Sequence, residues 1–263
     1  LINRIHYYLL NNIIPVFVFD GIPPIEKNET LKKRSNIKNK IKNKIEILSS
    51  IKTGEDKREI DKEINKLSNQ LIYVNKYHIL ECKKLLRLMG IPYFEAPDEA
   101  EKYCVYLYNE KFVDYVVTDD TDVLTFGGYK VLKTCIKNEI QEIDLNRFLI
   151  DINYTHDKFV DFCILSGCDY LPFIPNLAIN TVFNLFKKYN NIEDIMNLNK
   201  YTFPDNYDYK NIKKIFMNFD YNLENVEIKL NNINFYELKI FLENLQIKNI
   251  NNIIDKLKIL KIN

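Results

Sequence analysis

The stretch VVTDDTDVLTF, residues 116–126, places three aspartates within four positions between two apolar, β-branched runs. Val116 and Val117 are typical of the end of a buried strand, and Val123 and Leu124 of the start of a second buried element. An isolated carboxylate at such a place is costly to remove from water, so a compensating charge is expected. The stretch therefore predicts a strand whose end presents carboxylates to some positive charge.

Short apolar runs alternate with helical patterns along the first part of the chain. The strand-like runs are PVFVF (15–19), IPYFEAP (91–97), FVDYVVT (112–118), YKVLKT (129–134) and NEIQEI (138–143). Helical patterns separate the first three, and from about Asp157 onward almost every pattern is helical. Such alternation predicts the α/β class, with a mostly parallel sheet flanked by helices. We expect an α/β core over residues 1–155 and a helical lobe over residues 156–263.

Two helical stripes lie between the first and second predicted strands. Pro23 and Pro24 favour the start of a helix, since proline is tolerated in a first turn. Apolar residues then recur every three or four positions, at Ile37, Ile41, Ile45 and Leu48 and again at Ile60, Ile64, Leu67 and Leu71. The polar stretch SSIKTGED (49–56) interrupts them, so residues 26–75 are predicted to form a pair of helices.

Six carboxylates follow the ends of these predicted elements. They are Asp20 after the first strand, Glu99 and Glu101 at the start of the helix after the second, Asp120 and Asp122 after the third, and Asp169 at the end of a later helix. Ligand sites of open α/β sheets lie beyond the carboxyl ends of the strands, so these residues are expected to gather in one pocket. Asp120 and Asp122 would point the same way in an extended segment, and Asp119 would point away.

Like charges at this density need compensation. Two carboxylates about 5 Å apart repel by roughly 3 kcal/mol at an effective dielectric constant near 20, so either several are protonated or cations hold them together. An oxygen-only ligand set suits Mg²⁺ or Mn²⁺ rather than zinc. The pattern therefore predicts a divalent metal site.

Each carboxylate also has a purely structural interpretation. Asp98 and Glu101 have the spacing of a capping box at a helix start. Asp20-Gly21 fits an ordinary turn, and Asp169 fits a helix cap. These alternatives stay open for single residues, whereas a metal site accounts for all six carboxylates at once.

Positive charge is concentrated in one part of the chain. Residues 27–58 contain 11 Lys and Arg against 4 Asp and Glu, a net charge of +7, and because the whole chain carries +1 the remainder carries −6. This asymmetry fits a polyanionic partner, although a solvated helical face would also produce it.

Composition excludes other classes of protein. The longest apolar runs are about seven residues, against the roughly 20 needed to cross a bilayer, and no signal peptide pattern occurs. The five cysteines are scattered without a CxxC spacing, which indicates reduced thiols inside a cell rather than disulfides or a zinc site. No membrane partner is expected.

Four long stretches carry the most specific information. They are PVFVFDGIPPIEKNETLKKR (15–34), ECKKLLRLMGIPYFEAPDEAE (81–101), TDDTDVLTFG (118–127) and FVDFCILSGCDYL (159–171). In order, they resemble the strand and gateway helix, the two central acidic motifs and the last acidic motif of the structure-specific 5′ nucleases. This superfamily includes flap endonuclease, exonuclease 1 and the excision-repair nuclease XPG, and the chain looks most like flap endonuclease. The resemblance runs from about residue 4 to residue 200 and implies a PIN-like nuclease core.

The resemblance implies a role for the acidic residues. Asp20, Glu99, Glu101, Asp120, Asp122 and Asp169 correspond to six of the family's seven metal-binding carboxylates. Two Mg²⁺ ions, or Mn²⁺, are thereby implied, the first held by Asp20, Glu99 and Glu101 and the second by Glu101 and the remaining three. The seventh carboxylate belongs to an N-terminal strand that precedes residue 1, together with a glycine region that contacts DNA. We therefore expect the 263-residue chain by itself to bind metal poorly and to cleave little.

The resemblance also assigns the basic residues. Lys27 and Arg34 fall where the family places two side chains that contact the scissile phosphate, and their seven-residue spacing puts them on one face of a helix. Residues 26–75 resemble the helical arch that admits a single-stranded 5′ flap. On it, the predicted DNA-binding lysines are Lys32, Lys33, Lys38 and Lys42. Their binding should weaken with salt.

The chain departs from the family in its second half. Segment 160–190 resembles a helix-two-turn-helix, but PFIPNLAIN (172–180) has Asn176 and Ala178 where the family has glycines, which puts its grip on duplex DNA in doubt. We find no peptide of the sliding-clamp type, and residues 190–263 are only weakly family-like.

These observations predict a monomeric, divalent-metal-dependent 5′ flap endonuclease that acts on branched or flapped DNA in replication or repair. Hydrolysis would follow a two-metal mechanism without a side-chain nucleophile. The alternatives are a 5′→3′ exonuclease of the same superfamily and an inactive DNA-junction binding remnant. The compartment would be the nucleus of a eukaryotic cell or a cytoplasmic viral replication site.

Overall fold

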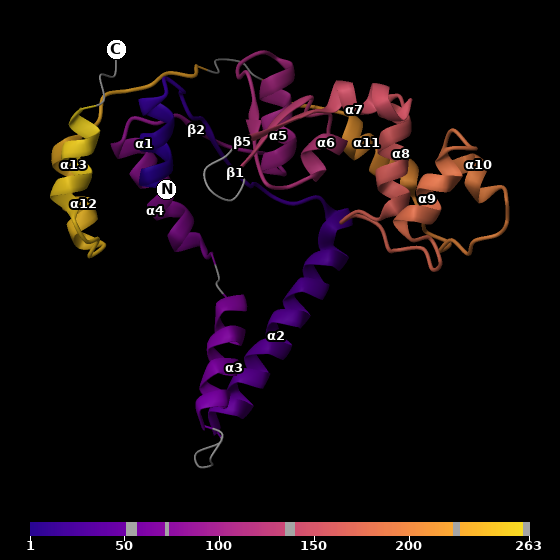
Figure 1. Cartoon of the computed structure of the whole chain (residues 1–263), viewed down its shortest axis with the longest axis horizontal. Helices are drawn as coiled ribbons and strands as arrows, with labels where there is room; N and C mark the ends of the chain where they lie inside the picture. Colours follow the sequence, from indigo (N-terminus) through magenta and orange to yellow (C-terminus); the bar gives the residue numbers. More distant parts are fainter. Residues whose placement is uncertain (51–56, 72–73, 135–139, 223–226, 260–263) are drawn as a thin grey trace. The chain divides into compact units, whose positions relative to one another are not determined.

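The computed structural model describes residues 1–50, 57–71, 74–134, 140–222 and 227–259 (Figure 1). The chain divides into two compact units, each built from segments that are distant in sequence. The first unit contains residues 1–19, 36–95 and 224–263, and the second contains residues 20–35 and 96–223.

The first unit holds a two-stranded parallel sheet and four helices around one apolar core. Strand β1 (Phe17–Phe19) pairs with β2 (Tyr93–Glu95), with Phe17 opposite Tyr93. The helices are α1 (Ile2–Leu10), α4 (Lys76–Leu88), α12 (Phe235–Asn244) and α13 (Ile250–Lys258). The fully or almost fully buried side chains of this core include Ile5, Leu86, Met89, Leu238 and Leu257.

The two helical stripes form long helices, as predicted. Helix α2 (Asn28–Ser50) begins in the second unit and continues into the first, and α3 (Lys57–Gln70) follows it. The two helices lie side by side in Figure 1, and Lys44 of α2 is 2.9 Å from Glu63 of α3. None of the described side chains of α2 is buried. The predicted break at 49–56 lies largely outside the described residues.

The second unit holds a three-stranded sheet in the order β3-β4-β5. Strand β3 (Val116–Val117) runs parallel to β4 (Lys130–Thr134), which pairs antiparallel with β5 (Ile140–Asp144). The helical elements of this unit are η1 (Ile25–Lys27), α5 (Ala100–Asn109), α6 (Asp122–Thr125), α7 (Leu145–Ile152), α8 (His156–Ser166), α9 (Ile179–Phe186), α10 (Ile192–Met196) and α11 (Tyr209–Met217). Its core includes Phe126, Val131, Ile164, Phe186 and Phe216.

The predicted helix-two-turn-helix segment is a pair of packed helices, α8 and α9. The linker between them begins with Gly167 at φ +118, where an added Cβ would lie 2.1 Å from the ring of Phe173, so only glycine fits. Asn176 adopts φ 64, a left-handed conformation that asparagine tolerates better than most residues. Asparagine therefore supplies here the turn for which the family uses glycine.

The α/β class and the helical second half are confirmed. The described strands form two small sheets, and two of their three pairings are parallel. One detail was wrong: Val117, expected to be buried, is 47% exposed, whereas Val116 is 3% exposed. The predicted domain boundary after residue 155 stays a prediction. Among the described helices, none combines the length and the apolar character needed to cross a membrane.

Candidate functional site

All six predicted carboxylates belong to the second unit and lie at the ends of its elements. Asp20 directly follows β1, Glu99 is the N-cap of α5, and Glu101 lies in its first turn. Asp120 lies between β3 and α6, Asp122 is the first residue of α6, and Asp169 lies three residues after α8. The positions relative to strand and helix ends are therefore those that the sequence predicts.

The Asp20-Gly21 pair is fixed against the start of α5. Asp20 Oδ1 accepts a hydrogen bond from the backbone N–H of Ala100 at 3.0 Å, which caps one of the free donors of the helix. The N–H of Gly21 donates to the carbonyl of Asp98 at 2.7 Å, and a Cβ on Gly21 would lie 1.9 Å from the carbonyl oxygen of Ala96. Glycine is thus needed for close backbone approach, and the ordinary-turn interpretation is wrong.

The capping box considered for Asp98 and Glu101 does not form. The N-cap is Glu99, whose side chain makes no capping hydrogen bond among the described residues. The carboxylate of Asp98 is instead 3.2 Å from Lys102 Nζ and accepts a hydrogen bond from the hydroxyl of Tyr221. Glu101 is therefore not committed to a helix-capping role.

Glu99 is a buried carboxylate, 7% exposed, with a donor on each oxygen. Lys27 Nζ donates to Oε1, and the hydroxyl of Tyr170 donates to Oε2. Burial by itself would lower the pKa of Lys27, but the carboxylates of Glu99 and Asp169 raise it above its ordinary value. Lys27 is therefore a permanent cation placed directly on a predicted metal ligand.

Asp169 is held by residues of η1 and of the first two turns of α2. Arg34 Nη2 lies 2.9 Å and 2.8 Å from its two carboxylate oxygens, and Lys27 Nζ is 3.4 Å from Oδ2. The hydroxyl of Thr30 donates to the backbone carbonyl of Asp169 at 2.7 Å. Lys27 and Arg34 thus share one face of this helical segment, as their spacing predicts.

Residues 118–122 are not extended, which corrects the geometry expected for the aspartate pair. The hydroxyl of Thr118 accepts from the N–H of Asp120 at 3.1 Å, and Asp120 Oδ1 accepts from the N–H of Asp122 at 2.9 Å. These local bonds replace strand geometry by a turn that leads into α6. Asp120 and Asp122 are therefore brought together by the turn and not by strand periodicity.

The carboxylates influence one another electrostatically. Burial, together with the charges of Asp120 and Asp169 and against the opposing effect of Lys27, raises the pKa of Asp122 to about 6. Burial likewise raises the pKa of Glu101, with contributions from Asp20, Asp120 and Glu99. The six side chains therefore share one region of negative potential.

The donor set fits a hard divalent cation, because it consists of carboxylate oxygens in mutual repulsion. As they stand, however, no three His, Cys, Asp or Glu side chains of the described residues are gathered closely enough to hold a metal ion. Lys27 and Arg34 compensate Glu99 and Asp169 instead. The metal assignment of the six carboxylates stays a prediction.

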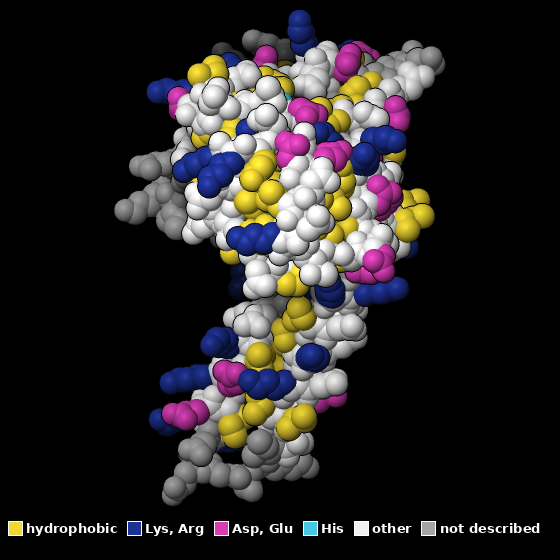
Figure 2. Space-filling view, turned by 90° about the vertical axis from the view of Figure 1, so that its right-hand side faces the viewer, with side chains coloured by type: hydrophobic (Ala, Val, Ile, Leu, Met, Phe, Trp, Pro, Cys, Tyr) yellow, Lys and Arg dark blue, Asp and Glu magenta, His cyan; other side chains and the backbone are white. Residues whose placement is uncertain are grey.

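The predicted DNA-binding lysines, Lys32, Lys33, Lys38 and Lys42, are all exposed on α2. In Figure 2, the helical pair α2–α3 carries Lys and Arg side chains on both sides of a row of hydrophobic side chains. This exposure suits a polyanionic ligand, but it does not test the assignment.

Sequence reasoning missed two residues that complete the site. Tyr170 and Thr30 contact Glu99 and the backbone of Asp169. A signal for each was present, since Tyr170 directly follows Asp169 and Thr30 lies between Lys27 and Arg34. Neither tyrosine nor threonine is a preferred metal ligand, and for this reason neither residue was included among the predicted site residues.

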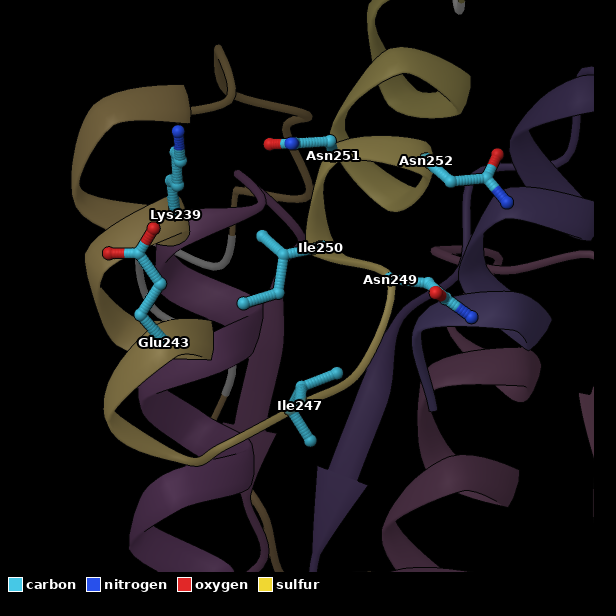
Figure 3. A pocket seen from close by; sticks show the side chains of 7 residues that line it. All are labelled: Lys239, Glu243, Ile247, Asn249, Ile250, Asn251 and Asn252. Carbon is cyan, nitrogen blue, oxygen red and sulfur yellow. The ribbon is translucent and has the colours of Figure 1, made fainter.

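A separate hollow lies in the first unit between α12 and α13 (Figure 3). It is lined by Lys239, Glu243, Ile247, Asn249, Ile250, Asn251 and Asn252. None of the predicted site residues lines it. The hollow is therefore unrelated to the carboxylate cluster.

Comparisons with known proteins identify the family of the chain. Family models match residues 1–41 as an XPG N-terminal domain and residues 90–169 as an XPG I-region. Flap endonuclease 1 of Enterocytozoon bieneusi is 37% identical over 214 residues, which cover 80% of this chain and 57% of that protein. Flap endonuclease 1-A of Xenopus laevis is 39% identical over 215 residues, covering 79% and 54%. The chain thus spans about half the length of these curated relatives.

Solved structures show the same fold. Flap endonuclease-1 from Methanococcus jannaschii superposes with a TM-score of 0.70 at 29% identity, covering 98% of this chain and 79% of that chain. The catalytic core of Rad2 in complex with a DNA substrate superposes with a TM-score of 0.74 at 21% identity, covering 98% and 81%. With its N-terminal and I regions matched in order, the chain belongs to the XPG family, the structure-specific 5′ nuclease superfamily that includes flap endonuclease.

Proposed function

We propose that this protein is a divalent-metal-dependent, structure-specific 5′ flap endonuclease. It hydrolyses DNA phosphodiesters close to junctions between single-stranded and double-stranded DNA, in replication or repair. Support comes from membership of the XPG family and from relatives that are flap endonucleases.

One observation carries the proposal. Lys27 and Arg34, the residues expected at the scissile phosphate, ion-pair with Glu99 and Asp169, which are expected to bind metal. The pairs join residues 72 and 135 positions apart in the sequence. Hydrolysis of a phosphodiester by this mechanism requires cationic side chains and metal ions at one place. This region provides both the cationic side chains and the carboxylates expected to bind metal.

The metal ligands we propose are the six carboxylates. Asp20, Glu99 and Glu101 would hold one Mg²⁺ or Mn²⁺ ion, and Glu101, Asp120, Asp122 and Asp169 a second. Bound there, two divalent ions would activate water as the nucleophile and neutralise charge on the reacting phosphate. The raised pKa values of Glu101 and Asp122 support this assignment, because burial and, secondarily, neighbouring carboxylates disfavour their ionised forms, and a bound cation would offset both effects.

The basic residues have a direct chemical role in this mechanism. Lys27 stays protonated near neutral pH and can exchange its carboxylate partners for non-bridging phosphate oxygens. Arg34 presents a planar guanidinium that can bind two oxygens of a phosphate through two of its nitrogens, although at present Nη2 alone contacts both oxygens of Asp169. Both charges then oppose the negative charge that grows in the transition state. Thr30 keeps this helical segment at Asp169 through its backbone contact.

The helical pair α2–α3 supplies the substrate preference. Lys32, Lys33, Lys38 and Lys42 would follow the phosphates of a single-stranded 5′ flap, and binding should weaken steeply with salt. We propose that the protein acts on flapped or branched DNA as a monomer.

The test is cleavage by the full-length protein of matched substrates of one sequence, labelled at the 5′ end, in Mg²⁺, Mn²⁺ or EDTA. We expect a 5′-flapped duplex to be cut near its junction far faster than a blunt duplex, and no cleavage in EDTA. Processive degradation of blunt or recessed 5′ ends with little flap cleavage would favour the 5′→3′ exonuclease. Junction binding without cleavage in either metal would favour an inactive binding module.

A further inference from the structure

Segment 218–222, which follows α11, is anchored to α5 by aromatic side chains. The hydroxyl of Tyr106 donates to the backbone carbonyl of Tyr221 at 2.8 Å. The ring of Tyr221 is centred 4.9 Å from that of Tyr106 and 5.2 Å from that of Tyr103, and Phe219 stacks on Tyr106 at 6.2 Å. The segment is therefore packed against α5 in a defined position.

From this position on α5, the side chain of Tyr221 contacts Asp98. Its hydroxyl donates to Asp98 Oδ1, and Lys102 Nζ lies 3.2 Å from Oδ2. Lys102 is 9% exposed, and its ammonium is 5.4 Å from the centre of the Tyr221 ring. A buried ammonium needs a counter-charge, so these contacts fix the direction of the Asp98 carboxylate. Asp98 thus faces Tyr221 and Lys102, although it directly precedes Glu99.

The backbone at Asp98 links two of the segments that carry the carboxylates. Its carbonyl accepts from the N–H of Gly21 at 2.7 Å. In return, Asp20 Oδ1 accepts from the N–H of Ala100 at 3.0 Å. Displacement of residue 98 would therefore disturb both the start of α5 and the segment that carries Asp20.

We infer that Tyr221 is a positioning residue for the proposed metal centre, acting through Asp98 to hold Asp20, Glu99 and Glu101 in one arrangement. The inference rests on the proposed function and adds to it a residue about 50 positions beyond the last acidic motif. Groups that orient metal ligands without touching the metal commonly change metal affinity or activity by about 10- to 100-fold when they are removed.

The first test is Tyr221→Phe, which removes only the hydroxyl and keeps the ring on α5. We expect the dissociation constant for Mn²⁺, measured by electron paramagnetic resonance on the full-length protein without DNA, to rise about tenfold. Hydrogen exchange at the amides of Gly21 and Ala100 should become faster, because both hydrogen bonds depend on the position of residue 98. Single-turnover flap cleavage at limiting Mg²⁺ should fall, and saturating Mg²⁺ should restore most of the rate.

A double-mutant cycle distinguishes action through Asp98 from a general structural role. If Tyr221 acts through Asp98, Asp98→Ala should weaken Mn²⁺ binding at least as much, and Tyr221→Phe added to it should change little more. Fully additive losses would overturn the inference. Thermal unfolding of each variant shows that the comparison is made between folded proteins.

Tyr154→Phe is the matched control, because the hydroxyl of Tyr154 is buried without a hydrogen-bond partner among the described residues. It should leave Mn²⁺ affinity and exchange at Gly21 unchanged. If the wild type binds Mn²⁺ and cleaves flaps while Tyr221→Phe matches it in every measurement, the inference about Tyr221 alone fails. If the full-length wild type neither binds Mn²⁺ nor cleaves, the proposed function fails and the inference fails with it.

Discussion

The basic segment that begins at Lys27 has two parts that carry the same net charge, +3 each, in different surroundings. In the first, residues 27–34, Lys27 and Arg34 pair with carboxylates far away in the sequence, and the side chain of Lys27 is 17% exposed. In the second, residues 36–50, the lysines are exposed, and Lys44 pairs with Glu63 of the neighbouring helix. Charge count alone does not separate these two parts.

The difference lies in the desolvation of Lys27, since the side chains of Arg34 and Lys44 are both more than half exposed. A largely buried pair such as Lys27 with Glu99 leaves an expensive unpaired charge when one partner is removed, whereas an exposed pair contributes about 0–1 kcal/mol and is screened by salt. The first part is therefore suited to act on a reacting phosphate at a fixed place. The second is suited to attract a polyanion over a longer distance.

The largest expected effect concerns the carboxylates that the first part faces. Asp120→Asn should abolish cleavage, by at least about 1000-fold, because it removes a charged ligand from the proposed metal site. Binding to a flapped junction should remain nearly intact, since the exposed lysines are unchanged. A Mg²⁺-dependent cleavage assay and a gel shift on the same preparation measure both quantities.

Asp119→Asn is the matched control for this prediction. Asp119 is the direct neighbour in the same turn and is exposed like Asp120, but it is not among the proposed metal ligands, so the loss of its charge should change turnover by no more than about twofold. Near-normal turnover of Asp120→Asn, or equal losses in both variants, would contradict the metal assignment.

The second prediction tests the first part of the basic segment. Lys27→Met should lower the single-turnover rate about 100-fold with little change in junction binding, because it removes one preorganised cation from the reacting phosphate. Lys32→Met, five residues further along and exposed, should leave the rate almost unchanged. If both variants lose the same activity, Lys27 acts only through general electrostatic attraction of DNA, and the distinction between Lys27 and the exposed lysines is wrong.

The third prediction tests the second part. The double substitution Lys38→Gln/Lys42→Gln should weaken flap binding a few-fold at moderate salt and reduce the slope of log affinity against log salt by about 2, one for each phosphate contact. The rate at saturating substrate should stay unchanged. Lys248→Gln/Lys256→Gln, on exposed residues of the first unit, should leave the slope unchanged. A fall in the saturated rate would place these lysines at the reaction itself.

Local pattern predicted the elements and the positions of the acidic residues well. Strand and helix periodicities are set by neighbouring residues, so β1, α2, α5 and the acidic positions that follow β1 and β3 could be predicted from the sequence. The same holds for the shared helix face of Lys27 and Arg34, which depends only on their seven-residue spacing.

What could not be predicted depends on contacts between distant segments or on competing local bonds. Nothing in the periodicity places Tyr221 on Asp98, since the partners are 123 residues apart. The turn at residues 118–122 was mistaken for strand because Thr118 and Asp120 use their side chains to bond the backbone, which a two-residue period cannot reveal.

The smallest expected effect is on stability, and it tests the carboxylate side of the comparison without DNA. The folded protein raises the pKa of Asp122 from 3.8 to about 6, chiefly through burial. A raised carboxyl pKa means that the folded state favours the protonated form, so this group stabilises the fold below its ordinary pKa, and the stabilisation is lost as the pH rises through about 6. In EDTA, the melting temperature of the wild type should therefore fall, relative to Asp122→Asn, between about pH 4 and pH 6.5. At pH 7 the variant should melt a few degrees higher.

Addition of Mg²⁺ should reverse the order, because a bound cation stabilises only the protein that keeps the ionised ligand. Melting curves of the two proteins and of Asp119→Asn, measured from pH 4.5 to 7.5 with and without Mg²⁺, decide the matter. Parallel curves of melting temperature against pH for wild type and Asp122→Asn in EDTA would show that neither burial nor the acidic neighbours raise the pKa of Asp122.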